Sequence, residues 1–239
     1  MNISTSWLRE WSDPNVSDID LAEKLTMAGL EVDKIGPVAP DFEGVVVGVV
    51  VSCERHPNAD KLSLCIVDIG KGSNLQIICG APNVRKGLKV AVATVGAVLP
   101  NNFKIKKAKL RGVESVGMIC SEAEIGLSDE HEGIMELDSS APLGENLRCF
   151  LDLDENIIEL DLTPNRGDCF SVLGVAREVC AIYDLALPKR EYRAKVTGKR
   201  TFNSTISSPK ACPKYLTRII EGIDTAAKTP QWMAQRLLR

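Results

Sequence analysis

The sequence GVVVGVVVS at residues 44–52 decides the fold class of the middle of this chain. Valine is β-branched, so a short valine run is typical of a strand and unfavourable in a helix. The run from Val45 to Val51 is the longest apolar stretch, yet it spans only seven residues and is broken by Gly48. A membrane-spanning helix needs about 20 apolar residues. We therefore expect a buried strand here and no membrane segment.

Further strands are predicted downstream at regular spacing. Strand character returns at residues 62–69 (LSLCIVDI), 75–79 (LQIIC), 90–95 (VAVATV) and 133–137 (GIMEL). Turns containing Gly, Pro and Asn separate these segments, which is typical of antiparallel sheets. Five or so strands without a helical period favour a Greek-key barrel of the OB type over a sandwich. We expect this barrel to span residues 39–151.

The segments on either side of the barrel have helical patterns. Ser17 is a good helix N-cap, and Gly29 is placed to end that helix in the left-handed conformation. Residues 171–184 repeat apolar side chains at helical spacing, and Thr229 followed by Pro230 is typical of a helix start, with Thr229 as the N-cap. No capping residue follows that last helix, so we expect the sequence to be part of a longer protein.

These patterns together predict an α+β protein with a discontinuous domain. We expect residues 1–38 and 152–190 to pack together as one small helical domain, with the OB-type barrel inserted between them. Residues 189–200 are rich in Lys and Arg and have the character of a linker. We expect residues 191–239 to hold this linker and the beginning of a further domain.

The cysteine spacing argues against a metal site. The chain has eight cysteines and two histidines, and no two cysteines are closer than 11 positions apart. Structural zinc sites use CxxC pairs, which are absent, and neither His56 nor His131 completes such a pattern. Most of the cysteines lie in apolar runs, where a free thiol acts as a small hydrophobic side chain. We expect reduced, mostly buried thiols, with no metal and no disulfide.

No catalytic residue is predicted. The sequence lacks the GxxxxGK[ST], GxGxxG, GxSxG and HExxH signatures. His56 could act as a general base, but a turn histidine before Pro57 is more often structural. The N-terminus has no basic start followed by an apolar stretch, so no secretory signal is predicted and we expect a cytoplasmic protein.

Charge is divided unevenly along the chain. Residues 69–113 contain nine Lys and Arg and no acidic residue, whereas residues 114–161 contain 14 Asp and Glu and one Arg. The basic block could bind a polyanion such as nucleic acid. It could equally fold against the acidic block and be neutralised there. Charge alone does not decide between these two interpretations.

Three dense strings in the predicted barrel carry a family resemblance. They are HPNADKL at residues 56–62, ICGAPNVR at 78–85 and RGVESVGMICS at 111–121. The barrel resembles the tRNA-binding OB domain shared by several tRNA-associated proteins. The flanking strings SWL at 6–8, LTPNRGDCFS at 162–171 and GVARE at 174–178 resemble the beta subunit of bacterial phenylalanine–tRNA ligases. One departure is Gly167, where that family usually has Pro.

The resemblance implies more than the composition does. It implies an (αβ)2 heterotetramer with an alpha subunit, which attaches phenylalanine to tRNA-Phe with ATP and Mg. The aminoacylation centre would lie in the alpha subunit, so no cofactor is expected within this piece. A hydrolytic editing module that removes misattached tyrosine would begin near residues 212–215, with its pocket beyond Arg239. Two alternatives remain: a stand-alone tRNA-binding, chaperone-like OB module, and an independent hydrolase of misacylated tRNA.

The candidate RNA-binding residues are the cations of the predicted barrel. Alternation along Lys104, Ile105 and Lys106 predicts that the two lysines share one strand face while Ile105 points inward. Phe103 is the only aromatic residue between Glu43 and Cys149, so we expect phosphate contacts and not base-specific reading. The full candidate set is Lys61, Arg85, Lys86, Lys104, Lys106, Lys107, Lys109 and Arg111. The alternative is a solvated strand and loop without a ligand.

Overall fold

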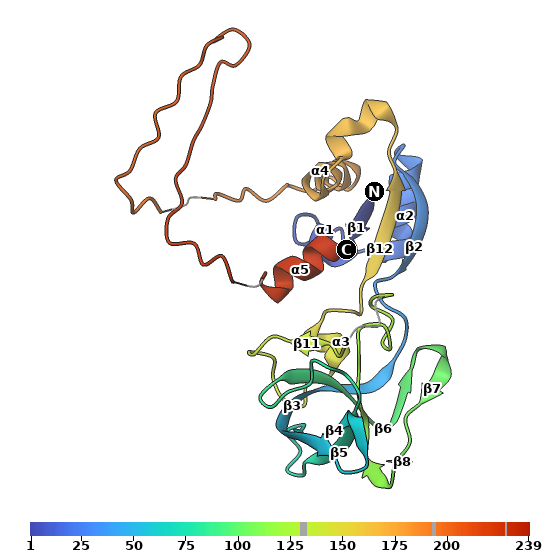
Figure 1. Ribbon diagram of the computed structural model, residues 1–239. Coiled ribbons are helices and arrows are strands. Elements are labelled where there is room, and N and C mark those ends of the chain that lie inside the picture. Colours follow the sequence, from blue (N-terminus) through green and yellow to red (C-terminus); the bar gives the residue numbers. More distant parts are fainter. Residues whose placement is uncertain (130–132, 193–194, 228) are drawn as a thin grey trace.

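Two bodies of structure lie one above the other in the computed structural model (Figure 1), which describes residues 1–129, 133–192, 195–227 and 229–239. His131, considered above as a metal ligand, is outside the described residues. The flank unit comprises residues 1–37 and 156–184, from the two sides of the chain. The central unit comprises residues 38–155. Each unit has its own hydrophobic core, and the central unit has two clusters of buried side chains.

The flank unit is built on a three-stranded antiparallel sheet. Its strand order is β1 (Asn2–Ser4), β12 (Asn156–Asp161) and β2 (Glu31–Pro37). The predicted small helical domain therefore also contains a sheet, which the prediction left out. Each strand is short, and β12 pairs with residues more than 110 positions away in the sequence. No local sequence pattern indicates this pairing, because the paired strands become neighbours only when the chain folds.

Within the described residues, three helices cover this sheet, and the second and third lie where the sequence patterns predict helices. They are α1 (Thr5–Arg9), α2 (Asp18–Met27) and α4 (Val172–Ile182). The Ser17 hydroxyl accepts a hydrogen bond from the Asp20 N–H at 3.1 Å, and Gly29 ends the helix at φ 92°. Gly174 allows α4 to approach the 3₁₀ turn η2 (Pro164–Cys169), because a Cβ there would lie 2.0 Å from the Asp168 carbonyl oxygen.

The central unit is an antiparallel sheet, which confirms the predicted antiparallel arrangement of its strands. Its strand order is β10-β6-β3-β4-β5, and β7 and β11 also pair with β6. A separate hairpin joins β8 and β9. The strands are β3 (Glu43–His56), β4 (Ala59–Asp68), β5 (Leu75–Cys79), β6 (Lys89–Leu99), β7 (Phe103–Lys104), β8 (Ala108–Leu110), β9 (Val113–Ser115), β10 (Met118–Ile119) and β11 (Glu136–Leu137).

The sheet curls until its two edges meet. The segment that joins β9 to β10 lies against β5, where the Val116 N–H donates to the Gln76 carbonyl at 2.8 Å. The Ser115 hydroxyl accepts from the Ile78 N–H at 3.1 Å. Gly117 makes this closure feasible: it has φ 136°, and a Cβ would lie 2.9 Å from the Ala93 carbonyl oxygen.

The remaining short elements complete the chain. A 3₁₀ turn η1 (Pro100–Asn102) precedes β7, and α3 (Leu147–Phe150) precedes the return to the flank unit. Between α4 and α5 (Gln231–Leu238) the described residues form no helix or strand. Pro230, not Thr229 as predicted, is the N-cap of α5, because its backbone is extended (φ −55°, ψ 139°) and Gln231 is the first helical residue.

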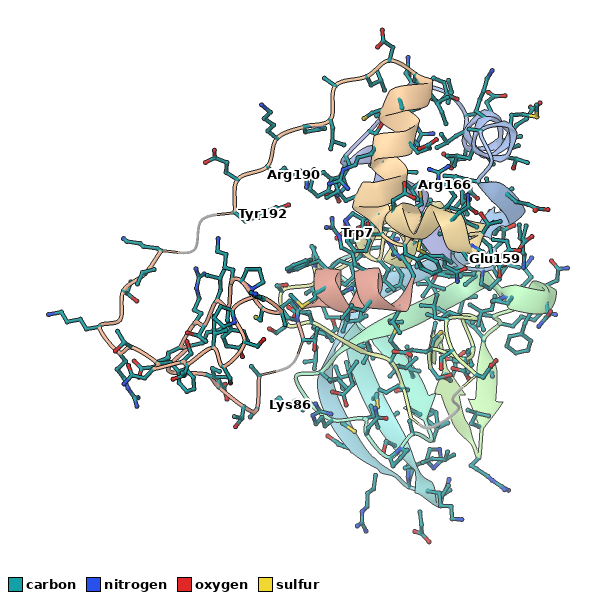
Figure 2. All side chains as sticks on the ribbon, turned by 90° about the horizontal axis from the view of Figure 1, so that it is seen from above. Trp7, Lys86, Glu159, Arg166, Arg190 and Tyr192 are labelled. Carbon is teal, nitrogen blue, oxygen red and sulfur yellow. The ribbon has the colours of Figure 1, made fainter. Side chains whose placement is uncertain are left out.

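Helix α5 returns to pack against the rest of the molecule. The Gln235 amide donates to the Leu151 carbonyl at 3.1 Å, and the Arg236 guanidinium lies 5.2 Å from the centre of the Trp7 ring. Figure 2 shows Trp7 beside α5, with Arg166 on the flank unit and Lys86 on the central unit. Arg190, which follows the flank unit in the chain, donates to the Glu10 carbonyl at 2.5 Å. Among the described helices, none combines the length and the apolar character that a membrane span requires.

Candidate nucleic-acid interface

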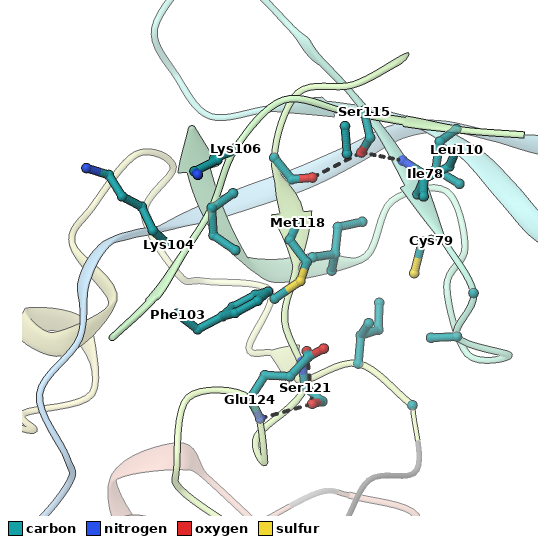
Figure 3. Close-up of a pocket in the computed structure, with 18 of the residues that line it drawn as sticks. Ile78, Cys79, Phe103, Lys104, Lys106, Leu110, Ser115, Met118, Ser121 and Glu124 are labelled. Atoms are coloured by element: carbon teal, nitrogen blue, oxygen red, sulfur yellow. Dashed lines mark hydrogen bonds between the residues drawn. The ribbon is translucent and has the colours of Figure 1, made fainter. Parts of the chain in front are cut away.

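A pocket of about 560 Å³ opens on the central unit (Figure 3). One wall is the end of β5 and the following residues 80–82, and a second wall comes from β10 and Ser115. A third wall is the basic segment, which we define as residues 103–111. Two of the three strings singled out in the sequence, at residues 78–85 and 111–121, therefore meet here with two of the predicted lysines, Lys104 and Lys106.

The basic segment presents its cations to solvent. Lys104 and Lys106 line the pocket and are exposed, whereas Ile105 between them is only 4% exposed. The predicted inward Ile105 and outward lysines are therefore confirmed, although the strand β7 ends at Lys104 and Lys106 lies beyond it. Lys107, Lys109 and Arg111 are also exposed. Within the described part of the chain, none of these five cations forms an ion pair with a carboxylate. Their charges thus remain available to an anionic ligand.

Arg85 differs from the other candidates. Its guanidinium donates to both carboxylate oxygens of Glu136, at 2.8 and 2.9 Å, and this pairing raises the pKa of Arg85. It also donates to the Asn83 carbonyl at 3.1 Å. The structure thus places part of the acidic block against Arg85, as the neutralisation alternative expected. Lys61 and Lys86 are exposed, but neither lines the pocket.

The string at residues 56–62 positions the hairpin β8–β9. His56 is 4% exposed, and its Nδ1 accepts from the Asn58 N–H at 3.1 Å. A backbone N–H can only donate, so the proton of neutral His56 is on Nε2, which donates to the Leu110 carbonyl at 3.2 Å. The Asn58 amide donates to the Arg111 carbonyl at 3.1 Å. Both ring nitrogens are thus occupied, and the structural role of His56 is the one that the geometry supports.

Phe103 contributes an exposed aromatic ring to the pocket, which the sequence does not predict. Because it is the lone aromatic residue of this segment, stacking was not expected, but Phe103 is 58% exposed and lines the pocket. Figure 3 shows the ring directed towards Met118, close to Lys104 and Lys106. No sequence signal other than its position next to the lysines could have identified it.

The string at residues 162–171 is a structural junction. Arg166 donates to Glu178 at 2.8 Å and contacts the Cys169 sulfur at 3.1 Å, which ties η2 to α4. Its hydrogen bonds to Asp168 lower the pKa of that carboxyl. Asp168, Cys169 and Glu178 have potential ligand atoms within 4.8 Å of one another, the one such group in the described residues. Because the Arg166 guanidinium already supplies the positive charge, these residues fit an ion-pair junction better than a metal site.

The cysteines behave as a free, largely buried set. All eight are unpaired, and five of them are buried. Burial raises the pKa of the Cys65 and Cys120 thiols to about 12, so both are protonated at neutral pH.

The central unit combines an antiparallel sheet with a pocket lined by the exposed Lys104 and Lys106, and a family comparison covers the same part of the chain. Residues 45–146 match a family described as "Putative tRNA binding domain". Over its whole length the chain is similar to phenylalanine–tRNA ligase beta subunits. It is 53% identical to the one from Pectobacterium atrosepticum, 54% to that from Dickeya dadantii and 52% to that from Yersinia pestis. The resemblance noted in the sequence is thereby confirmed.

The chain corresponds to only part of these relatives. It spans 30% of the length of each of the three beta subunits, while all of the chain is matched. Among solved structures, the C-terminal domain of Plasmodium vivax p43 is 23% identical, with 42% of this chain and 56% of that chain covered. Its TM-score of 0.33 is too low to define the fold.

Proposed function

We propose that this chain is part of the beta subunit of a phenylalanine–tRNA ligase and that its central unit, an OB-type barrel, binds tRNA. The observation that carries the proposal is the set of five exposed cations without ion-pair partners in the described residues. Two of them, Lys104 and Lys106, line the pocket, and all five lie inside the segment that matches the tRNA-binding family. An OB barrel binds nucleic acid through such a basic groove combined with a stacking surface.

The proposed assembly is the one that the family resemblance implies for the complete protein. In it, an alpha subunit pairs with the beta subunit in an (αβ)2 heterotetramer in the cytoplasm, and the complete enzyme uses ATP and Mg to charge tRNA-Phe. The present chain contributes tRNA binding and assembly without a catalytic centre of its own. Residues 191–239 lead into the editing module. The match at 52–54% identity covers the whole chain, including the flank unit, and this supports the proposal over a stand-alone tRNA-binding module.

The proposed binding mode is electrostatic. Each phosphate neutralised by Lys or Arg releases condensed counterions, so affinity falls with salt at a slope of about 0.7–0.9 per phosphate contact. Phosphate contacts fix the position of the RNA but carry no sequence information. We therefore expect the basic segment to bind unrelated tRNAs with similar affinity.

A salt titration with a charge-removing variant tests the proposal. Replacing Lys106 and Lys107 with Ala should lower the slope of log K against log salt by about one to two, for two unrelated tRNAs alike. The matched control replaces Lys24 and Lys34, two exposed lysines of the flank unit, and should leave the slope unchanged. Equal slopes for wild type and the Lys106/Lys107 variant would assign the basic segment to a solvated surface. Failure of an alpha subunit to co-purify with the complete gene product would favour the stand-alone module.

A further inference from the structure

The pocket beside the basic segment has the features of a site for a flat apolar ring. Phe103 is exposed, and Figure 3 shows its ring directed towards Met118. A thioether next to an aromatic ring is a favourable contact that supports the ring. The partly buried Met118 and the buried Ile119 continue the apolar floor. A pocket volume of about 560 Å³ is within the usual range for a small-molecule site.

The backbone holds the Phe103 ring in place before any ligand arrives. Residues 103–105 extend the pairing with β6, through Leu99 opposite Phe103 and Val98 opposite Lys104. The Ile105 N–H donates to the Ala97 carbonyl at 2.8 Å. Asn101 and Asn102, both at positive φ, make the tight turn that precedes the strand. A stacking surface on a paired strand loses little conformational freedom on binding.

Opposite charges lie at the two sides of this surface. In Figure 3, Phe103 and Met118 lie between the two lysines, Lys104 and Lys106, and the Ser121–Glu124 pair. Glu124 Oε2 accepts from the Ser121 N–H at 2.7 Å and from its hydroxyl at 3.0 Å, and the Glu124 N–H donates back to that hydroxyl at 3.2 Å. These bonds fix the carboxylate. Within the residues that the structure describes, Oε1 has no hydrogen-bond donor.

From this arrangement we infer that the pocket is a subsite for one unpaired nucleobase of the RNA, stacked on Phe103, with its phosphate at Lys104 and Lys106 and its amino group at Glu124. The inference rests on the proposed tRNA binding and adds base discrimination to it. A carboxylate repels phosphate, so the phosphate lies on the lysine side. A fixed carboxylate oxygen accepts from an exocyclic amine, such as N4 of cytosine, and repels the O4 carbonyl of uracil in the same position.

The stacking part of the inference is tested with Phe103→Leu in the whole 239-residue chain. The probes are fluorescently labelled ten-nucleotide oligo(C) and oligo(U) RNAs, followed by anisotropy. The usual free energy of stacking one base on an aromatic side chain predicts that affinity falls roughly tenfold for both RNAs. The slope of log K against log salt should not change, because no charge is removed. Phe103→Trp should retain binding. Phe170→Leu is the matched control, because Phe170 is also exposed but lies on the flank unit.

The amino-group part is tested with Glu124→Gln. The wild-type chain should bind oligo(C) several-fold more tightly than oligo(U). The variant can keep the Ser121 bonds through its amide oxygen while its NH₂ group replaces Oε1, so it should abolish or reverse this ratio. Removing the negative charge should raise the affinity for both RNAs by the same factor. The ratio of the oligo(C) and oligo(U) affinities is unaffected by this gain.

The outcomes separate this inference from the proposed function. Binding that depends on Lys106 and Lys107 but is unchanged in Phe103→Leu would overturn the nucleobase subsite and leave the electrostatic proposal intact. Equal affinities for oligo(C) and oligo(U) in the wild-type chain would overturn the role of Glu124. The absence of any RNA binding would overturn both proposals.

Discussion

Asp18 connects three parts of the flank unit. Its carboxylate accepts from Arg9 Nη2 at 2.7 Å and from the Asn156 amide at 2.8 Å, so α1, α2 and β12 meet at one side chain. Arg9 also donates to the Val16 carbonyl at 2.7 Å. Burial raises the pKa of Asp18, but the hydrogen bonds from Arg9 and Asn156 together outweigh it and hold the pKa below its usual value. The native state therefore favours the ionised carboxylate.

The expected consequence is stability that depends on pH. Because the folded pKa is lowered, the contribution is fully present above the unfolded pKa near 4 and is lost as the pH falls through the folded pKa. Asp18→Asn should cost about 1–2 kcal/mol at pH 7, since the pair is only partly exposed, and much less at pH 2–3. Urea unfolding followed by the fluorescence of Trp7 and Trp11 measures this. Asp33→Asn, at an exposed position of β2, is the control, and an Asp18 effect independent of pH would contradict the argument.

The sequence predicts the position of a side chain where nearby residues determine it, and fails where distant residues do. The cap at Ser17, the left-handed Gly29 and the inward Ile105 were all predicted, because each depends only on nearby residues. The position of Phe103 in the pocket was not predicted, since its other walls come from residues 78–82 and 115–121. The pairing of Arg85 with Glu136 likewise joins positions 51 residues apart.

The hairpin β8–β9 is held by side chains from the β3–β4 turn and from β5, and not by a core of its own. Asn58 donates to the Arg111 carbonyl, and Gln76 donates to the Glu114 carbonyl at 2.7 Å. All three residues of β8 are exposed. The hairpin carries Lys109 and Arg111, so its order decides where two of the proposed phosphate contacts lie.

Loosening this hairpin should weaken RNA binding without removing a charge. Asn58→Ala deletes one hydrogen bond, worth about 0.5–1.5 kcal/mol, and should lower tRNA affinity by a few-fold. Hydrogen exchange of residues 108–115 should become faster, while exchange in β3 and β6 stays slow. Asn74→Ala, in the turn before β5, is a control outside the hairpin contacts. Unchanged exchange in residues 108–115 would show that the hairpin does not depend on Asn58.

Strand and helix elements were predicted with unequal success for a physical reason. The valine-rich β3 and the apolar β5 are predicted from their composition. The strand β3 extends further than predicted, to His56, because its pairing with β4 continues to that residue. The flank sheet was missed because the polar β2, with sequence EVDKIGP, becomes a strand only through pairing with β12. Local composition could not indicate that partner.

The chain leaves and re-enters the flank unit at one point. Pro37 pairs with Asn156, and the Val38 N–H donates to the Glu155 carbonyl at 3.0 Å, so the two connections run side by side. Arg148 secures this junction from the central unit. It donates to the Pro40 carbonyl at 2.8 Å and to Asp154 at 2.6 Å. The connections therefore join the units without sharing a core, because the buried clusters of the two units have no residue in common.

This geometry predicts that the central unit can be removed from the chain. A protein of residues 39–151 alone should unfold cooperatively in urea, since both of its buried clusters lie almost wholly within that range. Residues 1–38 joined to 155–190 by a short Gly-Ser link should also fold, because positions 38 and 155 are hydrogen-bonded neighbours and loop closure over a short link costs little. Circular dichroism and urea titration of both proteins measure this, and the excised central unit should retain the salt-dependent tRNA binding of the whole chain. If residues 39–151 alone showed no cooperative unfolding transition in urea, contacts with the flank unit would be needed to complete the fold of the central unit. A folded central unit that no longer binds tRNA would instead place part of the RNA interface on the flank unit or on residues 191–239.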